Sequence, residues 1–136
     1  MRYNGNMMNN TMTYDFEDGA GEVPAHQHSN GGGWVADSAY VVANAFVGLD
    51  AKVYGNAKVY DNAQVYGHST VYDNAKVFGY AVVFDNAKVY DNAEVYGNAS
   101  VYGYAQVYGN ASVYGYAMVY DNAQVYGIAM VYDTAK

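Results

Sequence analysis

The sequence contains no cysteine, a single proline and no long run of apolar residues. Without cysteine, disulfide bonds and thiolate metal ligands are excluded. The segment 1–22 is polar and lacks the apolar centre of a secretory signal peptide. No stretch of the chain has the length of apolar sequence that is needed to span a bilayer. These absences predict a soluble protein with no membrane-inserted segment.

Basic residues are also scarce. The chain has 6 lysines and arginines against 13 aspartates and glutamates, which gives a net charge of −7. The basic residues form no cluster along the sequence. A chain with this charge repels nucleic-acid phosphates and anionic lipid surfaces. The composition therefore argues against a nucleic-acid partner and against membrane binding.

What the sequence does contain is one six-residue unit, V-x-[G/D]-x-A-x, which runs from Val35 to Lys136 without insertion or deletion. Valine recurs at every sixth residue up to Val131, and alanine follows four residues later in every unit except the one that has Ser69. A fixed hexapeptide period is typical of a parallel β-helix and outweighs local propensity. We expect one domain, with residues 1–33 as an N-terminal arm and cap and residues 34–136 as the repeat.

Alternation within the unit predicts which side chains face inward. If Ala57-Lys58-Val59-Tyr60 is a strand, Ala57 and Val59 face one side, and Lys58 and Tyr60 face the other. The next two residues, such as Asp61-Asn62, form a corner, where Gly and Asn tolerate a left-handed backbone. Three strands and three corners make a coil of about 18 residues, which is three hexapeptides. The expected fold is an all-β triangular prism of about 5.7 coils, roughly 27 Å long at the usual strand spacing.

The segment before the repeat lacks such a pattern. Residues 1–22 are rich in Asn, Met and Gly and are expected to form a mostly irregular arm. The first coil of a solenoid needs a cap, because its sheet edges and its core end are otherwise open. Trp34 directly precedes the first inward valine, and we predict that it closes the core at this end.

Residues three units apart should stack on neighbouring coils, and the stacks predict three outward aromatic ladders. Each ring pair would contribute roughly 0.5 to 1.5 kcal/mol. A row of corner asparagines is expected to add amide hydrogen bonds along the axis. The ladders are Tyr54, Tyr72, Tyr90, Tyr108 and Tyr126 on the first face; Tyr60, Phe78, Tyr96, Tyr114 and Tyr132 on the second; and Tyr66, Phe84, Tyr102 and Tyr120 on the third.

The outward residue before each valine distinguishes the three faces. On the first and second faces this row includes lysines, whereas on the third face it carries no charge from Phe46 to Met118. An uncharged aromatic face predicts an interface, unless the tyrosine hydroxyls hydrate it well enough for it to remain exposed to solvent. The predicted interface residues on the third face are Phe46, Val82, Phe84, Tyr102, Met118 and Tyr120.

The last strand, with Val131 and Tyr132, is expected to offer unpaired backbone groups to another strand. Together with the third face, it predicts a homo-oligomer. Copies would either stack end to end into a fibre or associate laterally in a closed trimer.

Few residues suggest chemistry. His68 lies at a corner and is the only histidine in the repeat, so it is the one candidate for a general base. His26 and His28 are two positions apart and could share one side of a strand, but two ligands make an incomplete metal site. We therefore predict no catalytic residues, no metal ligands and no cofactor.

The units V-Y-G-N-A and V-Y-D-N-A, preceded by His26, His28 and Asn30-Gly31-Gly32-Gly33-Trp34-Val35, resemble the hexapeptide-repeat left-handed β-helix proteins. Within that group, the tyrosine-rich repeats of bacteriophage, prophage and transferase-like proteins are the most similar. The resemblance covers residues 26–136 and implies a left-handed coil. Hexapeptide acyltransferases place small or acidic residues where this chain has Tyr or Phe, and they insert a pocket-building loop that this chain lacks.

This resemblance and the missing catalytic groups imply a non-enzymatic structural or adhesion component of a larger assembly. A phage virion or a surface fibre would be such an assembly, and other subunits or a host surface receptor would be the partners. An acyltransferase is the alternative that the fold alone supports. An ice-binding protein is a further alternative, but the repeat holds only Thr70 and Thr134 where ordered threonine arrays would be needed.

Overall fold

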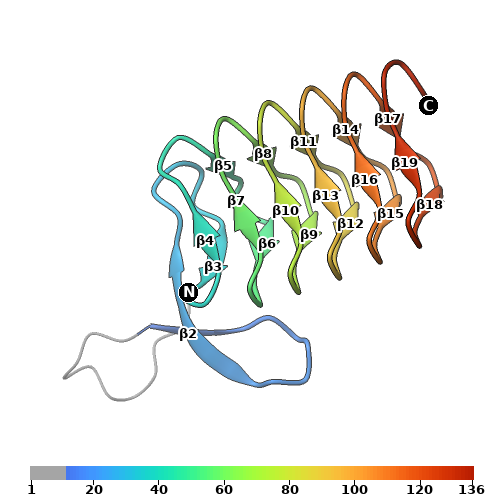
Figure 1. Cartoon of the computed structure of the whole chain (residues 1–136). Coiled ribbons are helices and arrows are strands. Elements are labelled where there is room, and N and C mark those ends of the chain that lie inside the picture. Colours follow the sequence, from blue (N-terminus) through green and yellow to red (C-terminus); the bar gives the residue numbers. More distant parts are fainter. Residues whose placement is uncertain (1–11) are drawn as a thin grey trace.

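The computed structural model describes residues 12–136, and this part of the chain is all-β. Short strands follow one another around stacked coils, and a hairpin of two strands lies at the N-terminal end, away from the C-terminus (Figure 1). No helix capable of crossing a membrane occurs among the described residues. The repeat from β3 to β19 therefore forms a β-solenoid, as the six-residue period predicts.

The first sheet contains the hairpin and every third strand of the repeat. β1 pairs antiparallel with β2, β2 pairs antiparallel with β3, and the remaining strands are parallel. In spatial order the strands are β1 (Thr13–Asp15), β2 (Glu22–Gln27), β3 (Trp34–Ala36), β6 (Lys52–Val53), β9 (Thr70–Val71), β12 (Lys88–Val89), β15 (Gln106–Val107) and β18 (Gln124–Val125).

The second and third sheets contain only repeat strands, all parallel. The second sheet has β4 (Tyr40–Val41), β7 (Lys58–Val59), β10 (Lys76–Val77), β13 (Glu94–Val95), β16 (Ser112–Val113) and β19 (Met130–Val131). The third sheet has β5 (Phe46–Val47), β8 (Gln64–Val65), β11 (Val82–Val83), β14 (Ser100–Val101) and β17 (Met118–Val119).

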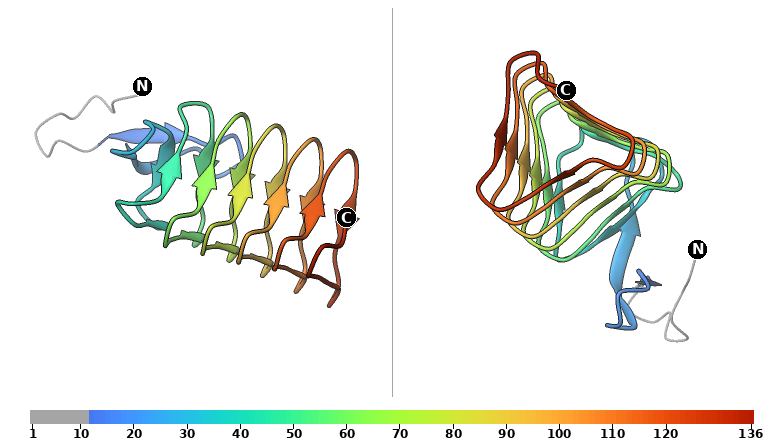
Figure 2. Two further views of the ribbon diagram at one scale, coloured as in Figure 1. Left: turned by 90° about the horizontal axis from the view of Figure 1, so that it is seen from above. Right: turned by 90° about the vertical axis from the view of Figure 1, so that its right-hand side faces the viewer.

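Strand register sets the length of one coil at three units. Lys76 pairs with Lys58 on one side and with Glu94 on the other, and Val77 pairs with Val59. Seen along the axis, the coils superpose on a triangular outline with one sheet on each side (Figure 2). The prediction of a triangular prism with three units per coil is confirmed, whereas the hand of the coil stays a prediction.

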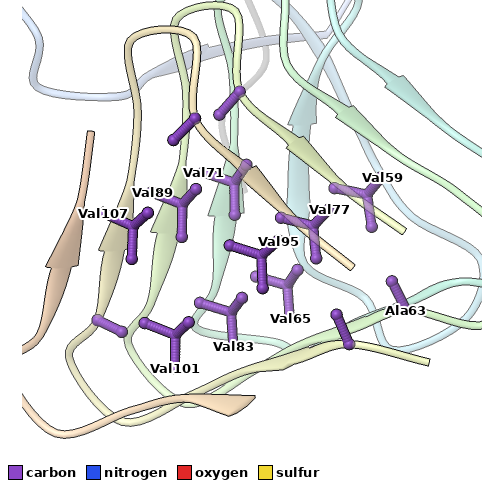
Figure 3. Packing of buried hydrophobic residues seen from close by; sticks show 14 of the residues in the cluster. Val59, Ala63, Val65, Val71, Val77, Val83, Val89, Val95, Val101 and Val107 are labelled. Atoms are coloured by element: carbon purple, nitrogen blue, oxygen red, sulfur yellow. The ribbon is translucent and has the colours of Figure 1, made fainter. Parts of the chain in front are cut away.

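The core consists of the valines and alanines of the repeat, stacked along the axis (Figure 3). Val59, Val77 and Val95 have no exposed surface, and neither do Ala57 and Ala63. Because valine and alanine lie two residues apart on a strand, both point inward while the residues between and beside them point outward. The predicted inward and outward faces are thus confirmed.

Each corner from Gly55 to Asp133 is a two-residue turn whose first residue has a left-handed backbone, whereas the corners of the first coil lack it. Glycines such as Gly67 have φ near 66°, and aspartates such as Asp85 have φ near 59°. A Cβ added at Gly67 would lie 2.9 Å from the backbone nitrogen of Asp85 in the next coil. Only a residue that accepts φ > 0 and a close neighbouring coil fits here, which explains the G/D position of the unit.

The N-terminal segment contains more structure than a mostly irregular arm implies. β2 extends the first sheet by pairing with β3, and His26 faces Val35 across this pair. Beyond β2, the carbonyl of Asn30 accepts a hydrogen bond from the Val47 N–H (3.0 Å), and the Gly33 N–H donates to the Val47 carbonyl (2.9 Å). A Cβ on Gly31 would lie 2.2 Å from that carbonyl oxygen. Glycine is therefore required where this segment crosses β5.

The prediction that Trp34 closes the core is wrong. Trp34 is buried, but in a separate cluster on the outer side of the first sheet with Phe16, Ala25 and Ala36. As the residue before an inward valine, it points outward by the alternation of the strand. Residues 28–33 lie instead against the first coil of the core, where the buried His28 ring contacts the carbonyl oxygen of Ala45 through Nε2 at 2.8 Å.

Candidate functional site

The third face is a flat array of uncharged side chains, held in register by five parallel strands. Phe46 pairs with Gln64, Gln64 with Val82, Val82 with Ser100, and Ser100 with Met118. All of these side chains are outward, and all except Gln64 are half-buried among their neighbours. The structure thus brings together the row that the sequence marked as an interface.

The aromatic ladder of the third face runs beside this row. Ring centroids of Tyr66, Phe84, Tyr102 and Tyr120 are separated by 5.2, 4.8 and 5.4 Å in turn, with interplanar angles between 7° and 12°. Phe46 meets Tyr66 edge to face at 6.4 Å. The row and its ladder together form a continuous uncharged surface along one side of the prism.

The predicted ladders on the other two faces are also present. Neighbouring rings on the first face lie 4.9 to 5.3 Å apart, and those on the second face lie 4.7 to 5.4 Å apart. Burial raises the pKa of Tyr54 to about 12, with smaller contributions from the carboxylates of Asp18 and Asp73. Burial likewise raises the pKa of Tyr72, and its neighbours Tyr54 and Tyr90 add to the effect.

The two remaining predicted interface residues lie elsewhere. Val131 and Tyr132 belong to β19 and its ladder on the second sheet, so they share no face with Val82 or Met118. Val131 is half-buried and Tyr132 is 47% exposed. The predicted interface residues therefore form two separate groups.

The corner aspartates have a role that sequence reasoning missed. The Asp85 carboxylate accepts a hydrogen bond from the backbone N–H of Gly103, 18 residues later, at 3.1 Å. Asp61, Asp73 and Asp91 make the same contact with the following coil. Asp73 and Asp91 occupy neighbouring coils, so two of these carboxylates stand on adjacent coils.

The expected amide ladder of corner asparagines does not form among the described residues. Asn56 and Asn74 join the coils through backbone instead, each donating its N–H to a corner carbonyl of the next coil at 2.8 Å. The coils are therefore linked at the corners by backbone hydrogen bonds and by aspartate carboxylates.

His68 is exposed at a corner and lines a cavity of about 340 Å³. Asp50, Lys52 and Thr70 line the same cavity, and Tyr14 and Trp34 belong to its wall. Sequence reasoning missed this cavity, because part of its wall comes from the N-terminal hairpin. No hydrogen bond between the described residues orients the imidazole, as a general base would require.

His26 and His28 do not converge. His26 is exposed, and its Nδ1 lies 2.7 Å from a carboxylate oxygen of Asp37, whereas the buried His28 contacts Ala45. In residues 12–136, no three side chains of the His, Cys, Asp or Glu type gather closely enough to hold a metal ion.

Comparison with known proteins supports the architecture. A family model described as YdcK Beta solenoid repeat matches residues 51–67 and 105–121. The chain is a β-solenoid repeat protein. The matched segments begin at Ala51 and Ala105, which are a whole number of coils apart, so both cover the same part of a coil. Searches of curated proteins and of solved structures found no match.

Proposed function

We propose that this β-solenoid is a non-enzymatic structural component that associates with further copies of itself through the third face. The observation that carries the proposal is the uncharged row from Phe46 to Met118, aligned by strand register beside an unbroken aromatic ladder. A contiguous uncharged patch of this kind on a protein surface is typical of an interaction site. The other two faces carry lysines in the same row.

The size of the face sets how strong such an association can be. Five strands spaced ~4.8 Å apart and a side of roughly 20 Å give about 400 Å² per copy. A stable interface usually buries ~800 Å² per partner. One pair of faces is therefore a weak contact, and a lasting assembly requires closed symmetry or many parallel contacts.

The resemblance to tyrosine-rich repeats of phage and prophage proteins supports a place in a virion or a surface fibre. A rigid rod with three laddered faces suits such a role, since parallel strands resist bending and leave side chains at fixed spacings. Contact with other subunits or with a host receptor would then use the same flat surfaces.

Light scattering on the purified protein over a range of concentrations tests the proposal. We expect the mass to rise above that of a monomer, and we expect Val82→Lys/Met118→Lys to return it to the monomer, because two charges would be placed on the face. Ser112→Lys/Gln124→Lys makes the same charge change on the other two faces and should associate normally. A wild type that stays monomeric at high concentration contradicts the proposal.

The non-enzymatic part of the proposal has its own test. His68 lines the cavity beside the hairpin without an orienting partner among the described residues, so we expect no acetyl-CoA turnover with amine or sugar acceptors. Turnover that disappears in His68→Ala would replace this proposal with acyl transfer.

A further inference from the structure

The N-terminal end of the second sheet differs from that of the other two sheets. In the first coil, the backbone groups of Val35, Val41 and Val47 point away from the next coil, because residues of a parallel strand bond alternately to either side. β2 pairs with Val35, and residues 30–33 bond both backbone groups of Val47. β4 pairs only with β7, and within residues 12–136 no strand lies against its other edge.

The aromatic ladders show the same difference. On the first face, Ala36 stands where later coils have a tyrosine, and Phe16 of the hairpin supplies the ring, stacked on Tyr54 at 4.8 Å. On the second face, Val42 stands at the equivalent position. Among the described residues, Tyr60 stacks only on Phe78 of the following coil, so the other side of its ring is open.

Tyr40 and Val42, the residues on either side of Val41, line one groove of about 990 Å³ together with Tyr60. Its walls include Tyr40, Val42, Asn44, Lys58, Tyr60 and Lys76. Tyr40 is 56% exposed. Lys58 and Lys76 lie side by side in register, and Asp61 is the one acidic side chain in the wall, so the groove carries a net positive charge in a chain of net charge −7.

The hairpin on the first face shows which chemistry fits such a groove. Trp34 and Ala36 above Lys52 and Tyr54 correspond, residue for residue, to Tyr40 and Val42 above Lys58 and Tyr60. On the first face, Tyr14 stacks on Trp34 at 4.7 Å, and Lys52 Nζ lies 5.5 Å from the Tyr14 ring centroid. The segment that supplies Tyr14 and Phe16 alternates them with acidic residues, namely Asp15, Glu17 and Asp18.

We propose that the groove on the second face binds a β-hairpin of a partner protein, one strand of which carries alternating aromatic and acidic residues. The other strand of that hairpin would pair with the open edge of β4, as β2 pairs with β3. The rings would lie on Tyr40 and Tyr60, as Tyr14 and Phe16 lie on Trp34 and Tyr54, and the carboxylates would lie beside Lys58 and Lys76. This site uses neither the row nor the ladder of the third face, so it is independent of the proposed self-association.

A synthetic fluorescent peptide with the sequence of residues 12–28 of this chain serves as the probe, because that segment occupies the equivalent positions on the first face. Fluorescence anisotropy with the purified full-length protein should give saturable binding. Lys58→Glu should weaken binding by roughly tenfold or more, since a lost ion pair is replaced by repulsion. Tyr60→Ser should weaken it as well, and a peptide with Tyr14→Ser/Phe16→Ser should not bind.

Two controls separate the groove from the first face. Lys88→Glu reverses a charge on the first face away from the hairpin and should leave the affinity unchanged. Lys52→Glu changes the charge beside Tyr14 on the first face. If the affinity depends on Lys52 but not on Lys58, the peptide has replaced the protein's own hairpin on the first face. That outcome overturns the proposal, as does the absence of saturable binding up to millimolar protein. Circular dichroism verifies that each variant is folded. If Lys58→Glu is not folded, Lys58→Gln is used in its place.

A second copy of the chain is the competing occupant. If the groove holds a second copy, unlabelled protein will displace the peptide. Light scattering will then show a dimer, and Lys58→Glu will abolish that dimer. This result would overturn a partner peptide as the occupant.

Discussion

At the scale of single residues, the inward valines decide whether the chain folds. Val89 lies near the middle of the prism with no exposed surface, between Val71 and Val107 of the adjacent coils. A carboxylate at this position would be buried without a partner, which costs several kcal/mol. We expect Val89→Asp to lose the β spectrum in far-UV circular dichroism.

The neighbouring residue provides the control for that experiment. Lys88 is outward and exposed, so Lys88→Asp changes charge at the adjacent position without burying it. It should keep the native spectrum and nearly the native melting temperature. A native Val89→Asp beside an unfolded Lys88→Asp would mean that inward and outward positions are exchanged.

The corner aspartates allow a finer test at the same scale. Asp85 combines a left-handed backbone with a carboxylate that accepts the Gly103 N–H. Asp85→Ala should reduce the free energy of unfolding by about 1–3 kcal/mol, because it loses a charge-assisted hydrogen bond and because alanine accepts the left-handed backbone less readily than aspartate.

Asp85→Asn and Asp85→Gly separate the two contributions. Asparagine tolerates the backbone and keeps an acceptor oxygen, so its free energy of unfolding should stay close to that of the wild type. Glycine also loses the carboxylate acceptor but relieves the backbone strain, so its loss should be smaller than that of alanine. Urea unfolding of the three variants measures the order, and an equal loss in all three would show that neither contribution matters.

At the scale of elements, the ladders make the fold sensitive to high pH. Burial raises the pKa of Tyr54 from its usual 10 to about 12, and burial also raises that of Tyr72. The unfolded chain releases these protons near pH 10, whereas the folded chain holds them to higher pH. The contribution of these protonated tyrosines to the free energy of unfolding is therefore fully present below pH 10, and it is lost as the pH rises through 12.

Thermal melts between pH 8 and pH 12 test this expectation, with absorbance at 295 nm reporting tyrosinate formation. The melting temperature should fall above pH 10, and it should fall less steeply in Tyr54→Phe/Tyr72→Phe, which cannot ionise at these positions. An identical pH dependence in wild type and variant would contradict a role for these half-buried tyrosines.

The strands and ladders also show how much of the fold could be predicted from the sequence. The period of six placed the repeat strands, their inward faces and the three ladders correctly, because one residue pattern recurs in every coil. Trp34 was assigned to the core end because it directly precedes the first inward valine, although alternation alone places it outward. The strands of the hairpin have no repeat to reveal them.

Two signals for the hairpin were nevertheless present in the sequence. Tyr14 and Phe16 alternate as outward residues of a strand do, and Ala36 lacks the ring that later coils carry. The missing ring in the first coil predicts that a ring from elsewhere will stack on Tyr54. Likewise, the spacing of Gly31 and Gly33 marks a close backbone approach, which the structure shows at Val47.

The cavity beside His68 and the groove beside Tyr60 could not be read from the repeat. Both arise where the first coils depart from the consensus, and their walls combine residues from different strands or from the hairpin. Their shape depends on packing that a linear pattern does not contain.

At the scale of the whole molecule, each coil contacts only its neighbours, so the rod should accept a change in length. Inserting a copy of residues 69–86 after residue 86 adds one complete coil and keeps every later strand on its own face. The free energy of unfolding should stay the same or rise, because stability in such folds is a sum over neighbouring repeats. Self-association should also be retained or strengthened, since the third face becomes longer.

Inserting a copy of residues 63–68 after residue 68 adds only one six-residue unit and separates fold from function. The core and the ladders continue, because valine, alanine and an aromatic ring recur at the same places in the unit. Every later strand, however, moves on by one face, so Lys76 and Glu94 join Phe46 and Gln64 in the row of the third face. We therefore expect this variant to melt near the wild-type temperature but to stay monomeric in light scattering. If it associates as strongly as the wild type, an uncharged third face cannot be the surface that holds the copies together.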